Sequence, residues 1–130
     1  MQVHLPGGWP RPKGYSNGVS ASGRMVFIAG MIGWDADGRF PGDDFAAQAR
    51  QALQNIAAVL AEAGGKPEHI VRMTWYVTDK REYLDAGKAV GAAFREVIGS
   101  YNAAMTAVEV RALMEDQAKV EIEATAVIPA

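Results

Sequence analysis

Residues 43–63, DDFAAQARQALQNIAAVLAEA, decide the fold, because they form the clearest periodic stretch of the chain. Apolar side chains recur there at three- and four-residue spacing, which predicts an amphipathic helix with one buried face. That face is made of Phe45, Ala49, Ala52, Leu53, Ile56, Leu60 and Ala63. Asp43 or Asp44 can accept hydrogen bonds from the free N–H groups of the first turn, and Gly64 suits the C-terminal cap.

Strands are predicted on both sides of this helix, where short apolar or alternating runs are bounded by turn residues. The predicted strands are residues 24–30, 69–77, 105–110 and 119–127, with room for a short strand near Val3. A second helix is predicted over residues 79–97, where Asp79 and Glu82 have the spacing of a capping box. The order of elements is therefore strand, helix, strand, helix, strand, strand.

This order predicts an α+β fold in which two helices pack on one face of a mixed β-sheet. The 130 residues fit a single domain, residues 1–130. Two helices leave the other face of such a sheet uncovered, although it still carries apolar groups. Another copy of the chain would cover that face, so the pattern predicts a homo-oligomer.

Composition narrows the classes of function. The net charge is −2 and the basic residues are scattered, which argues against nucleic-acid binding. Cysteine is absent, which removes disulfides and thiolate sites. No apolar run approaches the ~20 residues of a membrane span, so we expect a cytoplasmic protein without a membrane partner. His4 and His69 have no metal-ligand spacing with acidic residues, so no metal site is expected.

Several motifs occur in a familiar order. They are GYSNGV at residues 14–19, VFIAGMIG at 26–33, Gln48 with NIAAVLAEAG at 55–64, VEV at 108–110 and VEIEA at 120–124. Together they cover nearly the whole chain, and in this order they resemble the motifs of the Rid (YjgF/YER057c/UK114) family. The resemblance implies the chorismate-mutase-like YjgF fold and a homotrimer with active sites in clefts between subunits.

The resemblance also implies an activity. Family members hydrolyse reactive imines and enamines to a 2-keto acid and ammonia, without a metal or a cofactor. Other members have been described as ribonucleases or translation inhibitors. The chain is thus expected to be a deaminase-like hydrolase that acts on a small reactive imine or enamine.

The chain departs from the family pattern at three places. Deaminating members carry an arginine before the VEV strand that binds the substrate carboxylate, and Met105 stands there, followed by Thr106. Methionine offers a carboxylate neither charge nor a donor. Ala29-Gly30-Met31 replaces Ser-Gly-Gln, and Gly87 replaces an asparagine of the second helix. These changes predict a less polar pocket and a substrate that does not rely on a carboxylate at Met105.

Each candidate residue has a functional and a structural interpretation. Glu121 aligns with the carboxylate that orients water in the family, or it is a solvent-facing residue of an alternating strand. Tyr15 holds a ligand through its hydroxyl or packs at a boundary. The backbone at Gly30 and Met31 holds the substrate or makes a tight strand exit. Met105 is either pocket floor or core.

Two other possibilities stay open at this point. Arg111, just past the VEV strand, could replace the missing positive charge, or it could be a solvated arginine at a strand end. The loss of the arginine also supports a non-catalytic trimer that binds a small metabolite or a partner protein. Ribonuclease or translation-inhibitor activity is a third possibility, which nothing in the charge pattern supports.

Overall fold

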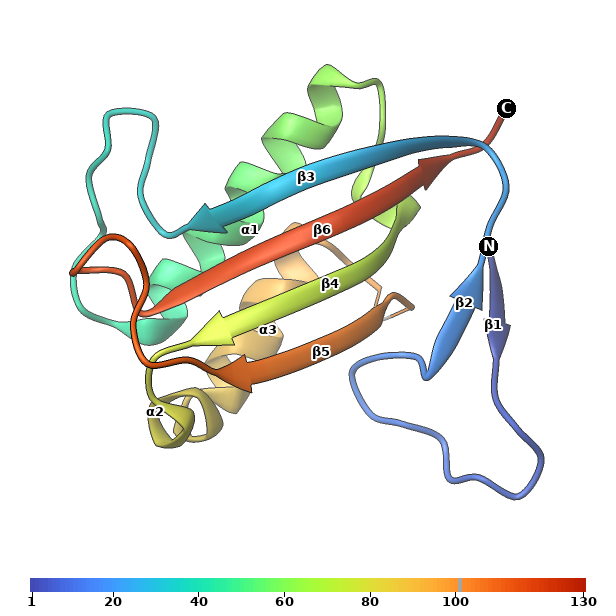
Figure 1. Ribbon diagram of the computed structural model, residues 1–130, viewed down its shortest axis with the longest axis horizontal. Helices are drawn as coiled ribbons and strands as arrows, with labels where there is room; N and C mark the ends of the chain where they lie inside the picture. The colour runs from blue at the N-terminus through green and yellow to red at the C-terminus, as the bar shows by residue number, and fades with distance from the viewer. Residues whose placement is uncertain (101) are drawn as a thin grey trace.

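The computed structural model describes residues 1–100 and 102–130, and its main element is a four-stranded sheet (Figure 1). The strand order is β3 (Arg24–Ile32), β6 (Val120–Ile128), β4 (Ile70–Val77) and β5 (Ala104–Glu109). β6 is antiparallel to both of its neighbours, whereas β5 runs parallel to β4. The predicted α+β fold with a mixed sheet is confirmed, and the strand bounds fall within two residues of those expected.

The helix α1 (Phe45–Glu62) begins and ends as its sequence predicts. Asp44 is the N-cap, and its carboxylate accepts a hydrogen bond from the Ala47 N–H at 2.9 Å. Gly64 follows the helix with a φ of 81°, a conformation that favours glycine, and its N–H donates to the Ala61 carbonyl. Seven side chains of α1 are buried against the sheet and α3, namely Phe45, Gln48, Ala49, Ala52, Leu53, Ile56 and Leu60.

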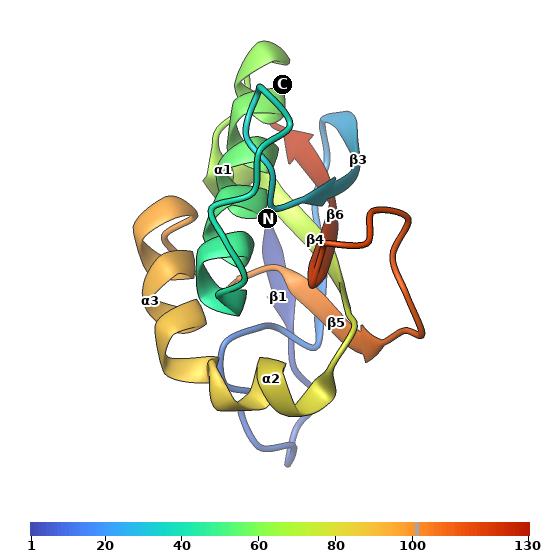
Figure 2. The same ribbon diagram turned by 90° about the vertical axis from the view of Figure 1, so that its left-hand side faces the viewer.

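The prediction of one helix over residues 79–97 was wrong, because the structure has two helices there. α2 (Lys80–Asp85) ends at Ala86, and α3 (Gly87–Val97) begins directly after it. Ala86 has φ −86° and ψ 3°, outside the helical region, so the chain changes direction there. α1 and α3 cover one side of the sheet, and α2 lies at the end of that layer (Figure 2).

A small second sheet lies at the N-terminus. β1 (Gln2–His4) pairs with β2 (Gly18–Ser20) in antiparallel register, and the segment between them loops out beside the main sheet (Figure 1). The short strand expected near Val3 is thus confirmed, and its partner β2 is an addition. The remaining short element is the 3₁₀ turn η1 (Pro67–His69) before β4.

The two faces of the main sheet differ in what covers them. On β6, Val120 and Ile122 are fully buried on the helix side of the sheet. Glu121 and Glu123 alternate with them and lie on the opposite side, which we call the open face. Phe27 of β3 lies on the open face opposite Thr125, and 73% of its surface is exposed. None of the described helices is long and apolar enough to cross a membrane.

Candidate functional site

A cavity of about 720 Å³ lies beside β5, on the side of the sheet that the helices cover. Its walls come from β4, β5, the helices α2 and α3, and the N-terminal segment before β2. Four of the residues singled out from the sequence line it: Tyr15, Gly87, Met105 and Thr106. The structure thus brings together residues that are up to 91 positions apart in the chain. We call this hollow the Met105 cavity.

Tyr15 reaches the cavity because the next residue is fixed to the start of β5. Ser16 is buried and forms an isolated parallel bridge with Ala104. Its N–H donates to the Ala103 carbonyl at 3.0 Å. The tyrosine side chain itself is 40% exposed, so its ring borders the cavity while part of it meets solvent.

Met105 combines the two roles that the sequence left as alternatives. It pairs with Met73 of β4, which is fully buried, so its side chain faces the helices. It packs against the hydrophobic core and at the same time lines the cavity. The position that carries an arginine in deaminating relatives of the resembled family is therefore an apolar part of the cavity wall.

Sequence reasoning missed several residues of the cavity. Trp75 and Tyr83 add aromatic wall, and their ring centroids lie 6.2 Å apart. Lys13 and Arg95 add positive charge. A signal for part of this set was present, because Gly87, Gly91 and Arg95 are four residues apart and so share one face of α3.

Trp75 is also unusual in its hydrogen bonding. Its side chain is 4% exposed, and the indole Nε1 is buried without an acceptor among the residues that the structure describes. An unpartnered buried donor of this kind costs roughly 1–3 kcal/mol. The neighbouring Tyr83 is itself half-buried, and this burial raises the pKa of its hydroxyl.

The remaining predicted residues, Glu121, Gly30 and Met31, do not line this cavity. Glu121 lies on the open face. Its carboxylate lies directly over Gly30, where a Cβ would come within 2.5 Å of Oε2. A bulge in β3 makes this approach possible: Ala29 and Gly30 together oppose Glu123, between the pairs Ile28–Ala124 and Met31–Ile122. Met31 itself packs toward the core, so of Gly30 and Met31 it is Gly30 that lies beside the Glu121 carboxylate.

We expect Gly30→Ala to displace the Glu121 carboxylate with little loss of stability, because the atoms in the way belong to the end of a flexible side chain. Any activity that depends on Glu121 should then fall by about tenfold or more, whereas the urea midpoint should change little. Steady-state rates and urea unfolding of the purified variant check this. A variant with full activity would show that the position of this carboxylate is unimportant.

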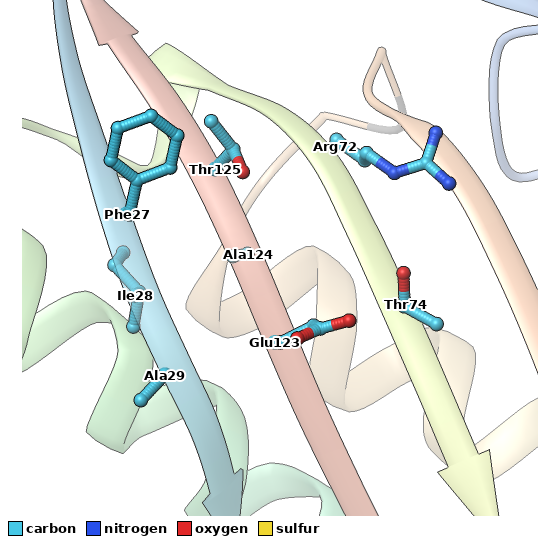
Figure 3. A pocket seen from close by; sticks show the side chains of 8 residues that line it. All are labelled: Phe27, Ile28, Ala29, Arg72, Thr74, Glu123, Ala124 and Thr125. Atoms are coloured by element: carbon cyan, nitrogen blue, oxygen red, sulfur yellow. The ribbon is translucent and has the colours of Figure 1, made fainter.

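A second hollow, of about 440 Å³, lies on the open face over β3, β6 and β4. Figure 3 shows Phe27, Thr125, Arg72, Thr74 and Glu123 around it. Glu123 accepts a hydrogen bond of 2.6 Å from the hydroxyl of Tyr76 on β4. This bond raises the pKa of Tyr76, so the hydroxyl stays protonated and remains a donor at neutral pH.

The other polar residues considered from the sequence have structural partners or lie apart. His4 bonds the Ser20 hydroxyl at 2.8 Å, and His69 Nδ1 accepts from the Lys66 N–H at 3.0 Å. Arg111 lines a different hollow with Asp116, so it does not replace the charge missing at Met105. Within residues 1–100 and 102–130, no cluster of three histidine or acidic side chains could hold a metal ion.

Comparison with known proteins gives a consistent result. Residues 10–128 match the family described as endoribonuclease L-PSP. The chain is 37% identical to the 2-iminobutanoate/2-iminopropanoate deaminase of Salmonella typhimurium. This identity holds over 113 aligned residues, which make up 87% of this chain and 86% of the relative.

Solved structures agree in fold. A Yersinia pestis protein of unknown function, YyfB of the conserved Rid family, is 34% identical, with a TM-score of 0.85 and 98% of each chain covered. Escherichia coli TdcF, solved with bound serine, is 31% identical, with a TM-score of 0.72 and coverage of 98% of this chain and 99% of that one.

Proposed function

Because this chain belongs to the Rid (YjgF/YER057c/UK114) family, we propose that it is a hydrolytic deaminase that converts a small reactive imine or enamine to a carbonyl compound and ammonia. The observation that carries the proposal is the Met105 cavity, where Tyr15, Gly87, Met105 and Thr106 meet. Imine deamination by the Salmonella relative supports the reaction class. No cofactor is needed for this reaction, because water and a base suffice.

The reaction requires a carboxylate close to the imine carbon, and Glu121 is our candidate. A water oxygen adds to the imine carbon while the Glu121 carboxylate takes one proton from that water and passes it to the imine nitrogen. The resulting carbinolamine then loses ammonia as its C–N bond breaks, and the carbonyl group forms. Tyr15 and the backbone at Gly30 would hold the substrate. An enamine enters the same sequence after it accepts a proton on carbon.

In a single chain Glu121 and the Met105 cavity lie on opposite faces of the sheet, which supports a site built from two copies. The open face carries the exposed Phe27 and the hollow over β3, β6 and β4. A second copy of the chain could pack against both of these features. We propose a homotrimer in which each cleft combines the cavity of one copy with Glu121 of the next. Three equivalent clefts follow from cyclic symmetry.

The test is an assay of imine hydrolysis on the purified protein. An amino-acid oxidase generates imines from several amino acids, and semicarbazide traps what the protein has not hydrolysed. Acceleration of keto-acid formation over the spontaneous rate supports the proposal. Absence of acceleration with every imine tried would refute deamination as the activity of this chain.

We expect Met105→Arg to increase the hydrolysis of imines from small amino acids such as alanine by about tenfold or more. The new guanidinium would bind the substrate carboxylate by charge-assisted hydrogen bonds. The matched control is Met114→Arg, because Met114 is 90% exposed on a loop outside the cavity. Equal rates for the natural protein and both variants would contradict a substrate site at Met105.

A second function is favoured by one observation, the methionine in place of the carboxylate-binding arginine. Under this alternative the trimer binds a small metabolite or a partner protein in the same cleft without turnover. A metabolite that raises the melting temperature and is recovered unchanged would support it, since binding to the native state stabilises by mass action. Nothing in the charge distribution supports a ribonuclease, and the net charge is −2.

A further inference from the structure

The charged residues of the Met105 cavity all have the same sign. Lys13 lines it from the N-terminal segment and Arg95 lines it from α3. Among the described residues of the lining there is no aspartate or glutamate. A hollow with cationic walls and no carboxylate attracts anions, because the fields of its charges add inside it. The cavity wall thus carries positive charge, although not at Met105.

The arginine shares one face of α3 with two glycines that also line the cavity. Gly87, Gly91 and Arg95 are successive members of one helical stripe, and all three line the cavity. A Cβ placed on Gly87 would meet nothing within 4 Å, so the space beside this glycine is empty. A ligand can therefore lie close to the helix backbone at Gly87, with its anionic end toward Arg95, which lines the same cavity.

The rest of the wall suits an aromatic group. Trp75, Tyr83 and Phe94 line the cavity together with Tyr15 and Met105. Aromatic rings and a thioether sulfur make favourable contacts with another ring. The volume of about 720 Å³ lies in the range of pockets that take whole drug-sized ligands, far more than a two- or three-carbon side chain needs.

We propose that the Met105 cavity selects 2-imino acids with a bulky aromatic side chain, whose carboxylate binds Arg95 and Lys13. The ring then lies over Gly87, against the aromatic wall. This inference rests on the proposed function for its reaction, but it concerns which ligand binds, and binding is measured separately from turnover. It gives Arg95 the role of a specificity-determining residue and explains how a carboxylate substrate can be kept after the change to methionine at position 105.

The test uses stable keto compounds as probes, with isothermal titration calorimetry of the purified oligomer. Phenylpyruvate carries both the ring and the carboxylate. Phenylacetone has a methyl group in place of the carboxylate, and 2-oxobutanoate lacks the ring. We expect phenylpyruvate to bind more tightly than either of the others by about tenfold or more, since each lacks one of the two contacts.

Variants separate the two contacts. Arg95→Met should weaken phenylpyruvate about tenfold and leave phenylacetone nearly unchanged, while Arg95→Lys should recover part of the loss. Arg81→Met is the matched control, because Arg81 is an exposed arginine of α2 outside the cavity lining. Gly87→Phe should abolish phenylpyruvate binding and spare 2-oxobutanoate, because the new ring fills the empty space. Melting curves identify any variant that does not fold.

Either of two results overturns the inference: 2-oxobutanoate or phenylacetone binding as tightly as phenylpyruvate, or Arg95→Met behaving like Arg81→Met. Failure of the proposed function looks different. If phenylpyruvate binds as expected but the imine formed from phenylalanine is not hydrolysed faster than in buffer, the ligand class stands and the deaminase does not. If imines are hydrolysed without preference for the aromatic ones, the deaminase stands and the ligand class does not.

Discussion

Glu121→Gln is expected to lower the rate of imine hydrolysis by about 100-fold or more while the protein stays folded. The amide keeps the size of the side chain but cannot take a proton from water, and positioned general bases contribute about 10²–10⁴ in rate. Glu121 lies on the open face with its carboxylate over Gly30, and it has no structural hydrogen bond among those described that the amide would break. Stopped assays with semicarbazide and a urea unfolding curve give the two quantities.

The same variant also tests whether each site is shared between copies. Gly87→Trp fills the Met105 cavity but leaves Glu121 intact, so each variant alone should be inactive. When the two are unfolded together and refolded as a 1:1 mixture, about a quarter of the clefts combine an intact cavity with an intact Glu121. Activity should return to about that fraction of the natural rate.

Two outcomes would contradict this scheme. If Glu121→Gln retains the natural rate, another group activates the water and the assignment of Glu121 is wrong. If the refolded mixture stays as inactive as its parents, the cavity and Glu121 do not meet across an interface. Refolded natural protein, taken through the same procedure, controls for losses during refolding.

Gln48→Leu is expected to lower the free energy of unfolding by about 2–4 kcal/mol, the largest stability effect that we expect. Gln48 is fully buried on α1, and both the nitrogen and the oxygen of its amide are hydrogen-bonded. Nε2 donates to the carbonyls of Gly42 at 2.9 Å and Gln117 at 3.1 Å, while Oε1 accepts from the Lys119 N–H at 2.9 Å. Leucine would leave these three backbone groups without partners.

Urea unfolding followed by circular dichroism measures this change. Gln54→Leu is the matched control, because it makes the same substitution on an exposed position of the same helix. We expect the control to stay within about 0.5 kcal/mol of the natural protein. If the free energy of unfolding of Gln48→Leu also stayed within this range, burial of the leucine would offset the loss of the three hydrogen bonds.

The sequence predicts the elements of this fold better than their arrangement. The periodicity of residues 43–63 locates α1 to within two residues at either end, because burial of one face and local capping agree there. The division at Ala86 was missed because the apolar stripe runs on through it and no proline or glycine precedes it. The insertion of β6 between β3 and β4 depends on pairing between distant segments, which periodicity does not encode.

The candidate site was predictable only in part. Motif resemblance brought Tyr15, Gly87, Met105 and Thr106 into one list, and the structure places all four around one cavity. Alternation along residues 119–127 placed Glu121 on one face of a strand, but which face depends on strand register. For that reason the sequence could not reveal that Glu121 lies across the sheet from the cavity. Arg95 was overlooked because it is not itself part of a motif used for the resemblance, although it shares one face of α3 with Gly87.

The central position of β6 has a consequence for how the protein is made. β3 and β4 are not neighbours in the sheet, since each pairs with β6 and reaches the other only through it. While the ribosome is still translating residues 1–119, the chain has its helices and three of four main strands, but it lacks the strand that joins β3 to the β4–β5 pair. Contacts of such long sequence separation form slowly. We therefore expect folding to follow synthesis rather than accompany it, and the emerging chain to depend on chaperones until residues 120–128 are free.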